Sequence, residues 1–182
     1  MGKSKAHEYR QAYNAQAVVC AEGTQLILAT NLATTPSDQP SFAQTILQMD
    51  KTIGLPRVVL ADAGYASGPA VARLKDRQIE PLVAIGRTQP HRRYDFRPPP
   101  EPKAKRTITE PWRLEMKAKL ETEEGKNQYS LRKQTVEPVF GIIKRAIRFT
   151  YFHLRGIPNV TSEWRLVALA YNCKRVARLR AA

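Results

Sequence analysis

Apolar residues in the first half of the chain gather in short runs separated by turn-forming residues and by amphipathic stretches. The first two runs, around Val18 and Leu26–Leu28, flank the pair Glu22–Gly23 and predict two strands joined by a turn. Residues 56–62 and 79–86 form two further short apolar runs, a pattern typical of strands buried on both faces. We therefore expect four strands in this half.

Two stretches between these runs have apolar residues at helical spacing. The first spans residues 36–54, with Asp38 as its N-cap and with Phe42 and Ile46 on one face. The second spans residues 66–78. The order strand, strand, helix, strand, helix, strand predicts an α/β fold with a mixed sheet.

From Trp112 to its end the chain has a helical pattern. Pro138 interrupts this pattern, because proline removes one helical hydrogen bond and disfavours helical geometry at the residue before it. A helix should therefore start again at Pro138 or kink there. Thr161 or Ser162 should cap the last helix. We expect helices over residues 111–126, ending near Gly125, and over residues 127–149 and 161–180.

Residues 87–111 lie between the two patterns and are rich in proline and basic residues. This composition predicts an exposed insertion. Arg92 and Arg93 stand close to Tyr94 and Phe96, and cations among aromatic rings suit nucleic acid. A plain linker is the alternative interpretation of this segment.

These patterns divide the chain into a core over residues 1–86, the insertion over residues 87–111, and a C-terminal helical part of the same domain over residues 112–182. Charge follows the division. The 182 residues have a net charge of +14; residues 1–86 hold 8 Lys/Arg against 7 Asp/Glu, and residues 87–182 hold 22 against 9. Such asymmetry favours a polyanion partner, most simply nucleic acid, over a merely solubilising surface.

Two classes of protein are not expected. Cys20 and Cys173 are too few for a disulfide framework, and we expect both to be buried in a reducing cytosol. No apolar run approaches the roughly 20 residues that span a bilayer, so no membrane association is expected.

Asp62 and Glu137 are the candidate chemical residues. Asp62 falls where the strand over residues 56–62 ends, and ligands of open α/β sheets bind beyond the carboxyl ends of strands. A turn aspartate that bonds nearby amides is the alternative. Glu137 is the only acid between Arg132 and Arg145. It could bind a hard cation while lysines hold phosphates, or it could simply relieve repulsion in a basic helix.

The segments "YNAQAVV", "VVLADAGYAS", "EGKNQYSLRKQTVEPVFGIIK", "FHLRG" and "EWRLVALAYN" resemble successive blocks of DDE transposases from bacterial insertion sequences. The likeness is closest to the branch with a Tyr–Arg–Glu–Lys signature. It implies a ribonuclease-H-like fold and cleavage and strand transfer of double-stranded DNA, at element ends and target DNA, with Mg²⁺ or Mn²⁺. It also implies a cytoplasmic, nucleoid-associated protein that forms a homo-oligomer or pairs with a full-length transposase.

The resemblance assigns Asp62 to the second acid of the triad and Glu137 to the third, both as catalytic and metal-binding residues. Spacing within the signature selects Lys133 at the position where the family has arginine, and Arg132 is one place off. Together with the insertion, these matches predict the DNA-binding residues Tyr129, Arg132, Lys133, Lys144, Arg145, Arg92 and Arg93.

The chain departs from the family at its first acid, which lies on the strand before the "YNAQ" block. Residues 1–14 offer only Glu8, in a charged stretch unlike that strand, and neither Asp38 nor Asp50 is expected to substitute. The expected fold is therefore a ribonuclease-H-like mixed sheet flanked by helices, incomplete at its N-terminal strand.

Three functions remain open. The chain could be a truncated copy of a transposase that still cleaves DNA. It could be a catalytically inactive DNA-binding remnant, or an inhibitor of the full-length transposase. It could also be a basic RNA-binding protein, which would leave the pattern of acids unexplained.

Overall fold

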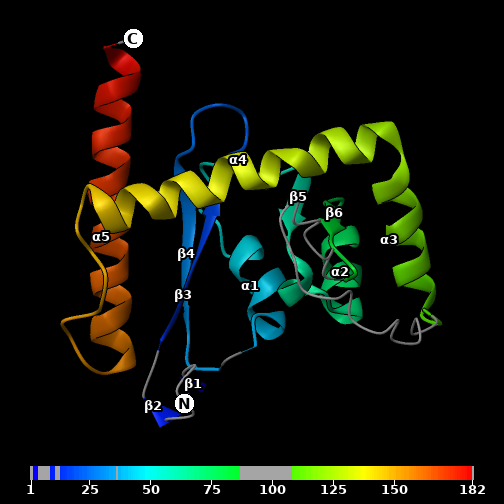
Figure 1. Ribbon diagram of the computed structural model, residues 1–182, viewed down its shortest axis with the longest axis horizontal. Coiled ribbons are helices and arrows are strands. Elements are labelled where there is room, and N and C mark those ends of the chain that lie inside the picture. Colours follow the sequence, from blue (N-terminus) through cyan, green and yellow to red (C-terminus); the bar gives the residue numbers. More distant parts are fainter. Residues whose placement is uncertain (1, 4–8, 11–12, 36, 87–107, 182) are drawn as a thin grey trace, which may run out of the picture.

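The chain folds into a mixed α/β structure with small sheets (Figure 1). The computed structural model describes residues 2–3, 9–10, 13–35, 37–86 and 108–181. In chain order the elements are β1 (Gly2–Lys3), β2 (Tyr9–Arg10), β3 (Asn14–Val19), β4 (Ile27–Ala33), η1 (Gln39–Ser41), α1 (Phe42–Leu47), β5 (Val58–Ala61), η2 (Ala63–Tyr65), α2 (Gly68–Lys75), β6 (Glu80–Val83), α3 (Pro111–Glu121), α4 (Glu123–Arg145) and α5 (Ile157–Arg180).

The strands pair in twos. β3 is antiparallel to β4, with Gln16 opposite Asn31, and β5 is parallel to β6, with Val59 opposite Pro81. β1 and β2 form a separate antiparallel pair. Antiparallel and parallel pairing therefore both occur as predicted, but the described strands form three separate two-stranded sheets instead of one continuous sheet.

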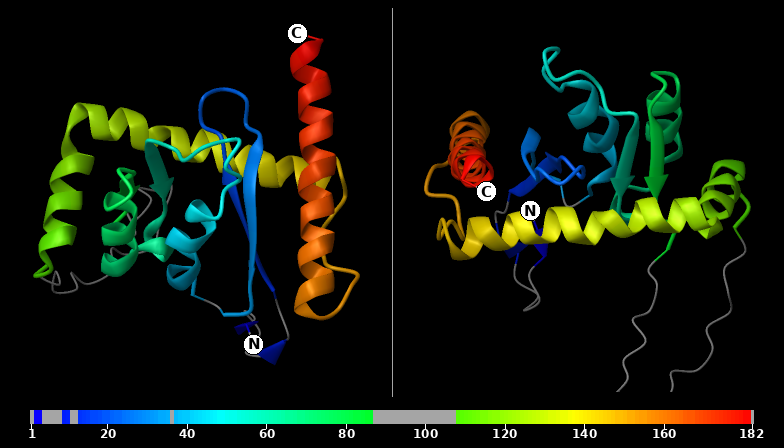
Figure 2. Two further views of the ribbon diagram at one scale, coloured as in Figure 1. Left: turned by 180° about the vertical axis from the view of Figure 1, so that it is seen from behind. Right: turned by 90° about the horizontal axis from the view of Figure 1, so that it is seen from above.

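Two hydrophobic cores lie side by side. The first joins α1, β5, α2 and β6, with Leu74 fully buried at its centre and Met116 of α3 covering it. The second lies between the β3–β4 hairpin, the C-terminal half of α4, and α5, and it contains Val139 and Trp164. Figures 1 and 2 show α4 running as one long helix past both cores.

Helix α4 has a capping residue at its start and favourable charges at both ends. Thr122 accepts a hydrogen bond from the amide of Gly125 at 3.0 Å, and Glu123 follows in the first turn. Lys144 and Arg145 lie in the last turn, so both charges suit the helix dipole. The helix therefore begins at Glu123, and the predicted boundary near Gly125 is wrong because Gly125 lies inside the first turn.

Pro138 neither restarts nor ends α4, which continues through it. Proline has no N–H, so the carbonyl of Gln134, four residues earlier, loses its helical donor. Gln25, in the turn between β3 and β4, donates from Nε2 to that carbonyl at 3.0 Å. A side chain from another element thus replaces the missing bond, which is why the helix tolerates the proline.

Three local expectations are wrong. Helix α1 covers only residues 42–47 of the predicted 36–54. Helix α5 begins at Ile157 after Gly156, so Thr161 and Ser162 lie inside it and do not cap it. Gly156 has a φ of 80°, a conformation that glycine adopts without strain. Cys173 is exposed on α5 instead of buried.

None of the helices in the described ranges is both long enough and apolar enough to cross a bilayer.

Candidate active site

Asp62 directly follows β5 and precedes the short helix η2. Its carboxylate accepts a hydrogen bond from the amide of Gly64 at 2.8 Å, and the residue is exposed. The turn-aspartate interpretation is therefore correct for the backbone contact. The same position, at the carboxyl end of a parallel strand, also leaves the carboxylate facing open space.

A second carboxylate lies beside Asp62. A Cβ placed on Gly64 would stand 3.0 Å from Oδ1 of Asp62 and 3.0 Å from Oδ2 of Asp38. The two oxygens are therefore separated by no more than twice that distance. Glycine at this position leaves the space between the two carboxylates open.

Amide side chains from the hairpin hold Asp38 in place. Nδ2 of Asn14 and Nε2 of Gln16 both donate to Oδ1 of Asp38, the latter at 2.8 Å. Oε1 of Gln16 in turn accepts from Nδ2 of Asn31 at 3.0 Å. Asp38 occupies the N-cap position of η1 but makes no capping bond, because its side chain is engaged by β3 instead.

Asp38 is a candidate site residue, although we expected from the sequence that it would not replace the family's first acid. Its place in a loop gave no reason to pair it with Asp62. The available signal was in the "YNAQ" block, since Asn14 and Gln16 alternate along a strand and so project from one face. Two adjacent amides on one strand face need a partner, and a carboxylate supplies it.

The two carboxylates affect the pKa of the nearby Tyr65. Burial raises the pKa of its phenol, and the negative charges of Asp38 and Asp62 raise the pKa further. All three causes disfavour the phenolate, so the ring stays neutral beside the acidic pair.

Helix α4 brings Tyr129 and Arg132 to the same strand end. The hydroxyl of Tyr129 donates to the carbonyl of Ala61, the residue before Asp62, at 3.0 Å. The guanidinium carbon of Arg132 lies 5.7 Å from the centroid of the Tyr129 ring. Burial raises the pKa of Tyr129, while the charge of Arg132 opposes that rise. Nε of Arg132 is buried without a hydrogen-bond partner among the described residues.

Glu137 lies further along the same helix and is exposed. It stands eight residues beyond Tyr129, roughly 12 Å along the helix axis. Within the described ranges, no three His, Cys, Asp or Glu side chains come close enough together to hold one metal ion. The structure thus places Tyr129 and Arg132 near Asp62. Glu137 does not form a three-acid group with Asp62 and Asp38.

The other predicted DNA-binding residues fall into two groups. Lys133, Lys144 and Arg145 are exposed on α4. Arg92 and Arg93 lie outside the described residues.

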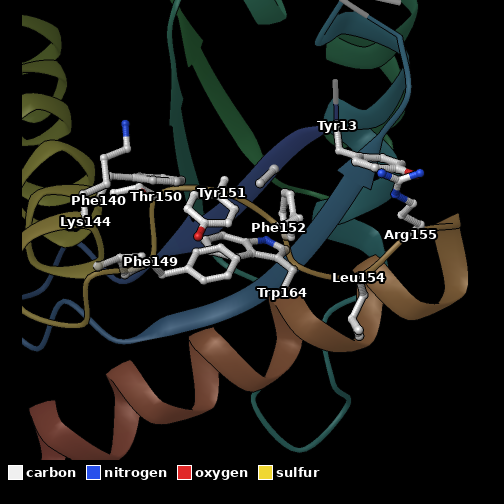
Figure 3. Close-up of a pocket in the computed structure, with 12 residues that line it drawn as sticks. Tyr13, Phe140, Lys144, Phe149, Thr150, Tyr151, Phe152, Leu154, Arg155 and Trp164 are labelled. Atoms are coloured by element: carbon white, nitrogen blue, oxygen red, sulfur yellow. The ribbon is translucent and has the colours of Figure 1, made fainter. Parts of the chain in front are cut away.

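An aromatic pocket of about 640 Å³ lies beside the last turns of α4. Figure 3 shows Lys144 and Arg155 on opposite sides of its rings. Phe140 stacks on Trp164 with centroids 5.9 Å apart, and Tyr151 lies at the exposed edge. The lining residues are Tyr13, Ala15, Phe140, Ile143, Lys144, Phe149, Thr150, Tyr151, Phe152, Leu154, Arg155 and Trp164.

Glu163 fixes the loop that forms one wall of this pocket. Its carboxylate accepts hydrogen bonds from the backbone amides of His153 at 2.9 Å and Leu154 at 3.0 Å. A helix that began at Thr161 or Ser162, as expected, would place Glu163 in its first turn, where an acid suits the helix dipole. Because α5 starts earlier, Glu163 instead ties the preceding loop to the helix.

Comparison with known proteins identifies the family of the chain. Residues 2–173 match the family model described as the transposase DDE domain. No curated protein and no solved structure matches the chain. Since the match covers almost the whole sequence, the chain belongs to the transposase DDE domain family.

Proposed function

We propose that this protein acts on double-stranded DNA as a DDE transposase, cleaving phosphodiester bonds and transferring strands, on a ribonuclease-H-like framework. Membership of the transposase family supports DNA transposition as the process. The supporting observation in the structure is the pair Asp62 and Asp38 at the carboxyl end of β5, beside Tyr129 and Arg132 of α4.

The acidic pair fits a divalent metal ion. Carboxylate and amide oxygens are the donors that Mg²⁺ prefers, and Mg²⁺ is often held by one or two carboxylates together with substrate phosphates. Asp62 and Asp38 would supply two carboxylates, and Gly64 leaves the space between them open. When bound, Mg²⁺ or Mn²⁺ would polarise the phosphoryl group for attack. Glu137 is proposed as the third acid from its position in the family motif alone.

The neighbouring cations would position the DNA. Arg132 is partly exposed beside the Tyr129 ring, and a guanidinium suits phosphate geometry. Lys133, Lys144 and Arg145 are exposed along α4, where they can neutralise further phosphates. The aromatic rim near Tyr151 can stack a base where the duplex opens.

A second candidate function is DNA binding without cleavage. It is favoured by the lack of a three-acid group in the described part of the chain. Such a protein would occupy element ends or pair with an active transposase, and its DNA affinity would fall steeply with salt.

The experiment is a cleavage assay with the purified chain, supercoiled plasmid DNA that contains the element ends, and Mg²⁺ or Mn²⁺. Asp62→Asn removes one carboxylate charge and should lower the cleavage rate by about a thousandfold, the scale of losing a key electrostatic group. Asp76→Asn, an exposed acid at the end of α2, is the matched control and should cleave at the wild-type rate.

The outcomes separate the candidates. If Asp62→Asn cleaves as well as the wild type, the site assignment is wrong. If the wild type binds DNA but does not cleave it with either metal, the non-catalytic function holds. The same assay with Asp38→Asn and Glu137→Gln shows which of these acids is needed for cleavage together with Asp62.

A further inference from the structure

The two carboxylate oxygens of Asp38 lie in different surroundings. Oδ1 accepts hydrogen bonds from the side-chain amides of Asn14 and Gln16, the latter at 2.8 Å. Oδ2 lies 3.0 Å from the point that a Cβ of residue 64 would occupy, on the side of Asp62. An oxygen that already accepts two hydrogen bonds has little capacity left. Oδ2 is therefore the oxygen that Asp38 offers to a ligand between the two acids.

Asn31 of β4 sets the direction of the Gln16 amide. Nδ2 of Asn31 donates to Oε1 of Gln16 at 3.0 Å, and Nε2 of Gln16 donates to Asp38. An amide carries its acceptor on one arm and its donors on the other, so the bond from Asn31 turns Nε2 toward the carboxylate. Gln16 is only 5% exposed, and water cannot easily replace either partner. We call Asn31, Gln16 and Asn14 the amide network.

The amide network is attached to the second core. Nε1 of the buried Trp164 donates to the backbone carbonyl of Gln16 at 2.9 Å. Gln16 also stands directly opposite Asn31 in the register of β3 and β4. The backbone under both amides is therefore held by the hairpin and by α5, and the network joins this rigid part to the acidic pair.

Other hydrogen bonds hold the backbone around Asp38. The hydroxyl of Ser41 donates to the carbonyl of Asp38 at 2.9 Å, and Nε2 of Gln39 donates to the carbonyl of Ala66 at 2.9 Å. These bonds tie the segment before α1 without using the Asp38 carboxylate. The amide network is thus available for a separate task, which is to orient that carboxylate.

We propose that Asn31, Gln16 and Asn14 are positioning residues for Asp38. By occupying Oδ1 they keep Oδ2 turned toward Asp62, so that the two carboxylates can share one divalent cation. This inference rests on the proposed function, because it takes the acidic pair as the place of the metal ion.

The experiment measures Mn²⁺ binding to the purified chain without DNA, from the loss of the electron paramagnetic resonance signal of free Mn²⁺. The key variant is Asn31→Asp. Its carboxylate accepts from Nε2 of Gln16, so the amide reverses and points Oε1 at Asp38. We expect Mn²⁺ affinity to fall about tenfold, the scale of losing a hydrogen bond to a charged group. A purely electrostatic effect has the opposite sign, because the added negative charge would attract the cation.

Three further variants complete the test. Asn31→Ala removes the orienting donor without adding charge, and it should weaken Mn²⁺ binding about two- to fivefold. Asn159→Asp makes the same charge change at an exposed position of α5 and should bind Mn²⁺ as the wild type does. Gln16→Met removes the donor to Asp38 at similar volume and should also bind more weakly. Urea unfolding checks which variants fold, and Asn31→Ala carries the test if Asn31→Asp does not.

The outcomes separate this inference from the proposed function. If the wild type binds no Mn²⁺, or if Asp62→Asn binds Mn²⁺ equally well, the proposed metal site is wrong and the positioning role is wrong with it. If Asp62→Asn loses Mn²⁺ while the folded Asn31 and Gln16 variants bind it as tightly as the wild type, only the positioning role is wrong. Tighter binding by Asn31→Asp would also overturn that role.

Discussion

The two ends of α4 lie in opposite chemical surroundings. Near its start, Tyr129 and Arg132 meet the carboxyl end of β5, where Asp62 and Asp38 gather negative charge. Near its end, Lys144 lies at an aromatic pocket whose other cation is Arg155. We propose the first end as the place of the metal ion and the reacting phosphate, and the second as a place for bases and the phosphates around them.

Under the proposed function, one helix would contribute to cleavage at one end and to DNA binding at the other. The first core buries the Tyr129 end and the second buries the stripe of Val139 and Ile143. Each half of α4 therefore packs on a different core, and the continuous helix fixes the distance between the two cores. The predictions below test whether the halves are coupled and whether their roles are separate.

The largest effect is expected from Leu74→Ala in the first core. Leu74 is fully buried, so the truncation should lower the free energy of unfolding by about 2–5 kcal/mol. In a Trp112→Phe background, Trp164 of the second core is the only tryptophan. If α4 couples the cores, the urea midpoint reported by Trp164 fluorescence should fall with Leu74→Ala. An unchanged midpoint would mean that the two cores unfold independently.

The next effect concerns DNA affinity at the aromatic end. Tyr151 is 66% exposed, and its ring is available for stacking. Tyr151→Ala should weaken binding of single-stranded or end-frayed DNA by about 1–3 kcal/mol, measured by anisotropy at fixed salt. Tyr151→Phe keeps the ring and should bind as the wild type does. Asp62→Asn should leave this DNA affinity unchanged. A comparable loss of affinity in Asp62→Asn would argue against separate roles for the two ends of α4.

A smaller effect is expected where Pro138 joins the two halves. Gln25→Glu replaces the donor to the Gln134 carbonyl with a carboxylate, which should lower stability by about 1 kcal/mol. In Pro138→Ala the helix regains its own N–H, so the same Gln25 substitution should cost less. Urea unfolding of the single and double variants measures this coupling. Equal costs in both backgrounds would show that the bond does not compensate for proline.

The smallest effect is a dependence on alkaline pH. Burial and the neighbouring carboxylates raise the pKa of Tyr65 in the folded chain above the ordinary value of 10.0. The folded state therefore favours the protonated phenol, and this contribution is complete below pH 10 and declines as the pH rises above it. Tyr65→Phe should flatten the fall in unfolding free energy as the pH rises above about 10. Tyr151→Phe, at the other end of α4, should not.

The sequence predicted most elements of this fold for local reasons. Short apolar runs identified β5 and β6, and helical spacing identified α2, where Val71 and Leu74 are buried. The resemblance of the "VEPVFGIIK" region to the transposase family agreed with the family match over residues 2–173. Asp62 was a candidate because it follows a predicted strand, but only the family resemblance assigned it to the acidic triad, and that role stays a prediction.

The remainder depended on contacts between distant residues. Asp38 is held by Asn14 and Gln16, more than twenty positions away, so no local pattern pairs it with Asp62. The sequence predicted a restart or a kink of the helix at Pro138, because the compensating donor, Gln25, lies far away in the turn between β3 and β4. The predicted roles of Glu137 and of the DNA-binding residues stay predictions, since a static arrangement of side chains does not test them.

The continuity of α4 through Pro138 makes its residue count critical. Deleting one residue between Arg132 and Val139 would rotate the rest of α4 by about 100° about the helix axis and shorten the helix by about 1.5 Å. Ile143 would then leave the second core, and Lys144 would turn away from its pocket. Insertions and deletions in this stretch should therefore be far more damaging than substitutions at the same exposed positions.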